Sequence, residues 1–100
     1  MTKTAAIAAY GDFQTPDALA AQVCGLLKAL DFKPGGILEP TCGVGAFIGA
    51  AADTFDVPML GVDVNAAHLH RAQERGVARA AWVQADFFAA DWGALCARLP

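Results

Sequence analysis

The sequence has few of the residues that build metal clusters, disulfide frameworks or membrane spans. Its three cysteines, Cys24, Cys42 and Cys96, form no Cys-x-x-Cys pair, which is typical of a reduced protein with buried thiols. Charged residues interrupt every apolar stretch before it reaches the roughly 20 residues that would cross a membrane. The N-terminus has one basic residue and a short alanine-rich run, which is too short for a secretion signal. We therefore expect a cytoplasmic protein that binds neither metal nor membrane.

Basic residues are also scarce. Seven Lys and Arg against ten Asp and Glu leave a net charge of −3, which argues against a general polyanion-binding surface within these residues. An enzyme acting on nucleic acid stays possible if its basic surface lies in another part of the protein. One hundred residues, 56% of them hydrophobic, are enough for one small globular domain.

Three short apolar segments are expected to be strands, at 37–39, 59–63 and 80–84. Helical patterns separate them, and strands that alternate with helices pair in parallel through right-handed crossovers. The expected fold is therefore α/β, one half of a doubly wound sheet with the spatial order three, two, one. In such sheets ligands bind beyond the carboxyl ends of the strands.

Four helices are expected around these strands. Residues with good capping side chains precede three of them, namely Thr15, Asn65 and Asp91, and the fourth spans 44–54. The helix after Thr15 is expected to end near Phe32. Its apolar residues recur at helical spacing: Leu19, Val23, Leu26, Leu27 and Leu30.

The segment 37–47 joins the first strand to a helix through an acidic, glycine-containing turn. Gly43 and Gly45 remove side chains where the backbone must turn sharply and approach a ligand closely. A dinucleotide site would place a third glycine where Ile48 stands, and Glu39 would repel a phosphate. The turn therefore suits a cofactor with a cationic end.

Four segments in this order and spacing, 11–16, 39–47, 61–65 and 84–87, resemble the class I S-adenosylmethionine-dependent methyltransferases. The likeness is to the branch that methylates the amino group of adenine in DNA. It implies the N-terminal half of a Rossmann-like domain, with an N-terminal motif and helix in 1–33 and a βαβαβ cofactor-binding half in 34–100. It also implies S-adenosyl-L-methionine as cofactor, DNA as substrate and a place in a restriction–modification system. The positions that match the cofactor-binding motifs are Phe13, Thr15, Pro16, Glu39, Pro40, Thr41, Cys42, Gly43, Gly45, Phe47, Asp63, Val64, Asp86 and Phe87.

The three carboxylates at strand ends have roles that fit this cofactor. Asp63 follows the first loop glycine by about twenty residues, near the spacing at which an acidic residue accepts ribose hydroxyls. Glu39 could meet the methionine ammonium, and the resemblance assigns Thr15 to the same end. Asp86 can accept from the adenine amine, and Phe87 can cover the adenine ring.

Simpler roles compete with these. Asp63 and Asp86 could cap helices or bond turns, and Glu39 could be a solvated loop acid. Phe87 could belong to the core, which is also where Phe88 is expected. The remaining polar and thiol side chains are expected to be structural: Cys42 as a small residue under the loop, His68 and His70 as surface histidines, and Arg71, Glu74, Arg75 and Arg79 as a solvated face.

The family's catalytic Asn/Asp-Pro-Pro-Tyr/Phe motif has no counterpart here, because no two of the five prolines are adjacent. We therefore assign no catalytic residue, and expect an N-terminal fragment of a longer enzyme that relies on the rest of its methyltransferase chain. An RNA or protein-glutamine methyltransferase fragment and a non-catalytic nucleotide-binding module stay open as alternatives. The first strand would be an unpaired apolar edge, so the isolated chain is expected to be marginally stable or to self-associate.

Overall fold

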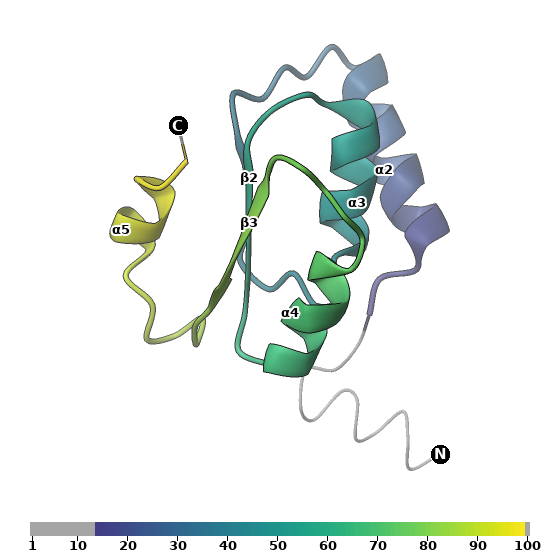
Figure 1. Ribbon diagram of the computed structural model, residues 1–100. Coiled ribbons are helices and arrows are strands. Elements are labelled where there is room, and N and C mark those ends of the chain that lie inside the picture. The colour runs from purple at the N-terminus through teal and green to yellow at the C-terminus, as the bar shows by residue number, and fades with distance from the viewer. Residues whose placement is uncertain (1–13, 100) are drawn as a thin grey trace.

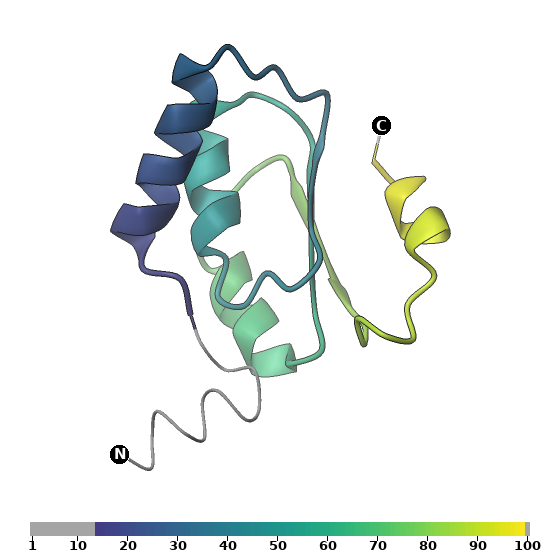
Figure 2. The same cartoon turned by 180° about the vertical axis from the view of Figure 1, so that it is seen from behind.

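The computed structural model describes residues 14–99, which form a three-stranded parallel sheet with helices on both faces (Figure 1). Helices α2, α3 and α4 lie over one face of the sheet, and α5 lies beside the opposite face (Figure 2). The 1–13 segment, with Phe13 of the proposed N-terminal motif, is outside the described residues. The elements are α2 (Asp17–Ala29), β1 (Ile37–Glu39), α3 (Ala46–Thr54), β2 (Met59–Asp63), α4 (Ala66–Gln73), β3 (Ala80–Gln84) and α5 (Trp92–Cys96).

The sheet has the order β1-β2-β3, with both neighbouring pairs parallel. This confirms the predicted fold class, the strand order and the bounds of all three strands. Glu39 pairs in register with Gly61, and Asp63 pairs with Gln84, so the carboxyl ends of the strands lie at one edge. The central strand β2 is buried along almost its whole length because it has a neighbour on each side and helices on the faces.

Three helix boundaries differ from the prediction, both ends of α2 and the start of α3. Helix α2 has Pro16 rather than Thr15 as its N-cap, and it ends at Ala29, before a turn in which Asp31 has a φ of 63°. Helix α3 begins at Ala46, later than predicted, because the preceding residues form the glycine turn. The predicted caps of the other two helices are confirmed: the Asn65 side chain accepts from Ala67 N and His68 N, and the Asp91 side chain accepts from Ala94 N.

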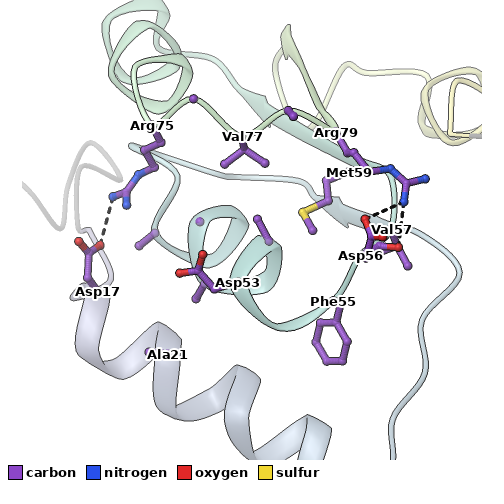
Figure 3. A pocket seen from close by; sticks show the side chains of 16 residues that line it. Asp17, Ala21, Asp53, Phe55, Asp56, Val57, Met59, Arg75, Val77 and Arg79 are labelled. Carbon is purple, nitrogen blue, oxygen red and sulfur yellow. Dashed lines mark hydrogen bonds and ion pairs between the residues drawn. The ribbon is translucent and has the colours of Figure 1, made fainter.

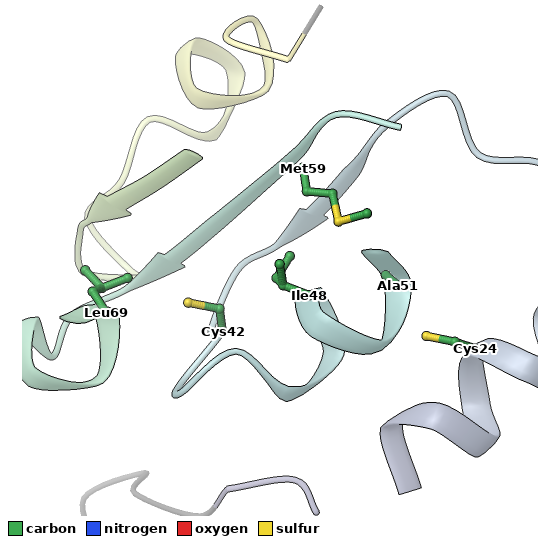
Figure 4. Close-up of a cluster of buried hydrophobic side chains, with 6 residues drawn as sticks. All are labelled: Cys24, Cys42, Ile48, Ala51, Met59 and Leu69. Atoms are coloured by element: carbon green, nitrogen blue, oxygen red, sulfur yellow. The ribbon is translucent and has the colours of Figure 1, made fainter. Parts of the chain in front are cut away.

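The core lies between the sheet and α3 and is built from small and medium side chains (Figure 4). Ile48, Leu60 and Val62 are the largest side chains that are fully buried. Helix α2 packs on α3 through Ala20 and Cys24, whose short side chains allow close approach of the two helices.

Most of the apolar residues that recur along α2 lie at the surface. Leu19, Val23, Leu26 and Leu30 are exposed by 49%, 36%, 60% and 70%. The helix contacts α3 with the side that carries Ala20 and Cys24, so most of its leucine-rich side is exposed. None of the described helices is long and apolar enough to cross a membrane.

We predict that Gly61→Ala destabilises the protein by roughly 1–3 kcal/mol, because a Cβ atom on this central strand overpacks the core. That atom would lie 2.6 Å from two Trp82 ring carbons and 3.2 Å from Cys42 Sγ. Gly25→Ala in α2 is the matched control: no atom lies within 4 Å of its Cβ position, so it should stabilise by about 0.5–1 kcal/mol. Urea unfolding measures both, and equal midpoints for the two variants would contradict the prediction.

Candidate functional site

A cavity of about 290 Å³ opens at the carboxyl ends of β1 and β2. It lies where Gln14 and Thr15, the glycine loop after β1 and the end of β2 meet. This is the position at which an open parallel sheet binds its ligand. Its walls are formed by Gln14, Thr15, Glu39, Thr41, Cys42, Gly43, Ala46, Phe47 and Asp63.

The glycine loop has a conformation that requires glycine. Gly43 and Gly45 have φ values of 55° and 86°, in the left-handed region that other residues rarely adopt. Cys42 N donates to Val62 O over 2.8 Å and fixes the loop to β2, while Gly45 N donates to Cys42 O over 2.9 Å. The loop therefore passes directly beneath the cavity and delivers the chain into the first turn of α3.

Asp63 joins the loop to the end of β2. One of its carboxylate oxygens accepts from Gly43 N at 2.8 Å, and the other accepts from Asn65 N at 2.8 Å. The turn-bonding role considered from the sequence is thus present, and the same side chain lines the cavity. Each carboxylate oxygen has a further lone pair, so Asp63 can still accept from ligand hydroxyls.

The two histidines of α4 differ in the exposure of their side chains. The His68 side chain is only 17% exposed, and its Nδ1 lies 3.9 Å from Asp63 Oδ1, so its predicted surface position is wrong. His70 is 78% exposed, as predicted, and lies 3.6 Å from Glu74 across one helical turn. His68 lies in the first turn of α4, where its backbone N donates to Asn65 Oδ1 at 3.1 Å. This position places its side chain near Asp63 at the end of β2. The described residues contain no cluster of ligands that could hold a metal ion.

Glu39 is a half-buried carboxylate at the end of β1. Burial raises its pKa, and the hydrogen bond from Thr41 N, at 3.4 Å, partly opposes this effect. Glu39 forms no ion pair with any described residue. A cationic ligand group in the cavity would offset the cost of burying this charge.

Cys42 is buried beneath the loop and is not suited to nucleophilic chemistry. Burial and the charges of Asp63 and Glu39 raise the pKa of its thiol to about 12, and Sγ lies 3.6 Å from Gly43 O. The thiol is therefore protonated at neutral pH. Its position under the loop agrees with the space-filling role expected from the sequence.

The third strand end lies apart from the cavity. Asp86 Oδ1 accepts from Phe88 N at 2.9 Å, as in the turn-bonding alternative, and Phe87 packs on Trp92 with ring centroids 5.4 Å apart. Phe88 is 93% exposed, so its predicted core position is wrong: the turn at Asp86 directs it away from the sheet. Of the predicted site positions, those that do not line the cavity are Pro16, Pro40, Gly45, Val64, Asp86 and Phe87.

Two side chains that contact the loop are not among the site residues predicted from the sequence. Gln14 Oε1 accepts from Val44 N at 3.0 Å, and Arg75 Nε donates to Val44 O at 2.7 Å. Gln14 lies inside the segment that carried the resemblance, so its position was a usable signal. The sequence places both Arg75 and Arg79 on a solvated face. Arg79 lies there and pairs with exposed Asp56 at 3.1 Å. Arg75 instead contacts the loop through Val44 O.

The parallel sheet with a ligand cavity at its carboxyl edge is the fold of class I S-adenosylmethionine-dependent methyltransferases. One solved structure with this fold is a Listeria monocytogenes protein assigned to that class, with a TM-score of 0.65 and 23% identity over 79% of this chain and 28% of the other. Another is an RNA methyltransferase from Salinibacter ruber in complex with S-adenosyl-L-homocysteine, with a TM-score of 0.62 and 24% identity over 79% of this chain and 54% of the other.

A relative of known class is similar in sequence as well. The type II methyltransferase M.NspV from Nostoc sp. is 38% identical over 96 residues, which cover 90% of this chain. The chain spans 20% of the length of that relative. No protein family model matches the chain. The resemblance to class I S-adenosylmethionine-dependent methyltransferases is thus confirmed by a sequence relative and by the fold.

We predict that Cys42 makes part of the stability dependent on alkaline pH. Because its folded pKa of about 12 lies above the ordinary value of 9.0, folding stabilises the protonated thiol. This contribution is fully present below pH 9.0 and is lost as the pH rises from 9.0 toward about 12. Urea unfolding of the protein and of Cys42→Ala at pH 8 to 11 should show a smaller fall for the variant. The other titrating groups are the same in both proteins, so their effects cancel in the comparison. Parallel plots of unfolding free energy against pH would contradict the prediction.

Proposed function

We propose that this chain is the S-adenosyl-L-methionine-binding part of a DNA adenine N6-methyltransferase of a restriction–modification system. The observation that carries the proposal is the convergence of Thr15, Glu39, the glycine loop and Asp63 on one cavity. The similarity to a type II methyltransferase and the likeness of segments 11–16 and 39–47 to the DNA adenine branch support DNA as the substrate.

The cavity has the polarity that this cofactor needs. Glu39 is an unpaired carboxylate within the described residues and would meet the methionine ammonium, and Thr15 lines the same cavity. Asp63 would accept the ribose hydroxyls with the lone pairs that its backbone donors leave free. Asp86 and Phe87, which follow β3 and lie outside the cavity, would meet the adenine end.

The bound cofactor supplies an electrophilic methyl group on a sulfonium. Glu39, Asp63 and the glycine loop would hold the cofactor so that this methyl could be transferred to a target amine. The residues of this chain contribute by holding one reactant in position, which is a large part of catalysis when two bound groups must meet. The acceptor adenine would be extruded from the duplex and held by a segment that carries the Pro-Pro motif.

RNA is the second candidate acceptor, because a solved neighbour is an RNA methyltransferase. That neighbour is 24% identical and indicates the fold, whereas the type II relative is 38% identical over nearly the whole chain. DNA is therefore the favoured substrate. Transfer of labelled methyl groups to adenine in duplex DNA, but not to RNA, by the complete enzyme would separate the two.

We predict that the chain binds S-adenosyl-L-methionine and that Glu39→Gln weakens binding about 10-fold or more, since a hydrogen bond to a charged group contributes about 1.5–3 kcal/mol. Calorimetric titration measures this, with NAD as a ligand that should not bind. Asp53→Ala, which removes an exposed carboxylate outside the cavity, is the matched control. Absence of binding by the folded chain, or equal loss in both variants, would refute the proposal.

A further inference from the structure

The guanidinium of Arg75 bonds to two residues that lie close in the chain to cavity-lining residues, Val44 after Gly43 and Asp17 after Thr15. Its Nε donates to Val44 O of the glycine loop at 2.7 Å, and its Nη2 donates to Asp17 Oδ1 at 3.1 Å. Figure 3 shows this side chain extending from the end of α4 toward Asp17 at the start of α2. Asp17 follows Thr15 of the cavity wall by two residues. The side chain of Arg75 is 28% exposed although it carries a charge.

Two glycines, Gly45 before α3 and Gly49 within it, make room for this guanidinium. A Cβ atom at Gly45 would lie 3.3 Å from Arg75 Cδ and Nε, and one at Gly49 would lie 3.2 Å from Arg75 Nη1. These contacts are tighter than ordinary van der Waals distances. Because the two glycines are four residues apart, they lie on the same side of the chain, and the Arg75 side chain passes close to both. The glycine at position 45 thus serves the arginine as well as the turn.

The peptide groups of Val44 are held from both sides by side chains. Val44 N donates to Gln14 Oε1 and Val44 O accepts from Arg75 Nε, at 3.0 Å and 2.7 Å. A planar guanidinium can donate in two directions at once, whereas a lysine ammonium acts as a single point charge. Arg75 is therefore suited to fix the loop and the start of α2 relative to each other.

We propose that Arg75 is a positioning residue for the S-adenosyl-L-methionine site, acting through Val44 and Asp17. The inference rests on the proposed function. Binding requires the loop wall and the Thr15 wall to be at the correct separation, and the two hydrogen bonds of Arg75 set that separation. A loop held in place before the ligand arrives binds more tightly because less ordering is required on binding.

The test compares S-adenosyl-L-homocysteine binding by the parent chain with binding by Arg75→Gln, Arg75→Lys and Asp17→Asn. Arg75→Gln should weaken binding about 10-fold or more, since it removes a charge-assisted hydrogen bond to each wall. Arg75→Lys keeps the charge but not the fork and should recover part of the loss, and Asp17→Asn should show a smaller loss. Arg71→Gln is the matched control, because Arg71 is exposed in α4, four residues before Arg75, and its side chain pairs with no described residue.

Two further readouts separate positioning from general destabilisation. Hydrogen exchange without ligand should be faster at the amides of Val44 and Gly45 in Arg75→Gln than in the parent, with the β2 amides unchanged. Urea unfolding reports global stability, and Asp17→Asn alters a carboxylate that is 75% exposed, so that variant should fold normally.

The outcomes distinguish this inference from the proposed function. Binding by the parent together with an unchanged Kd for Arg75→Gln would overturn the inference alone. A loss shared equally by Arg71→Gln, or one that follows global unfolding in every variant, would also overturn it. Absence of binding by the parent chain would overturn the proposed function and the inference with it.

Discussion

The carboxylate of Asp63 is the constraint on which the candidate site depends. It ends the central strand, accepts from Gly43 N in the loop and from Asn65 N at the start of α4, and lines the cavity. A carboxylate that accepts two backbone N–H groups fixes three segments in one place. The cavity has a defined floor because this single side chain holds the loop and the next helix to the same strand end.

Small residues let the surrounding helices support that site. Gly45 brings the loop against Ala72 of α4, whose Cβ would lie 3.0 Å from a Cβ added at that glycine. Ala20 and Cys24 allow α2 to pack closely on α3. Because these residues are small, few large side chains are fully buried in the core. The leucine side of α2 is exposed. Alanine and glycine thus allow close packing but bury little apolar side-chain area.

Charge is arranged differently inside and around the cavity. Glu39 is half-buried with a raised pKa and no cationic partner within the described residues, whereas Asp17 and Asp56 are paired with arginines on the outside. A cationic ligand group beside such a partly desolvated carboxylate would lower its energy. The paired arginines serve the loop, the start of α2 and the turn before β2.

The sequence by itself determined the strands, their parallel order, the caps Asn65 and Asp91, and the cavity residues Glu39, Gly43 and Asp63. These features depend on local patterns: apolar runs, capping side chains and glycine turns act over a few residues, and strand ends of a parallel sheet share one edge. Only the tertiary structure decided that α2 packs through Ala20 rather than its leucines, that Phe88 points outward, and that His68 and Arg75 turn toward the loop. Helical spacing shows which residues share a face, but not which face has a neighbour. Long side chains such as that of Arg75 reach partners that are distant in sequence, and only the packed fold brings Val44 and Asp17 within its reach.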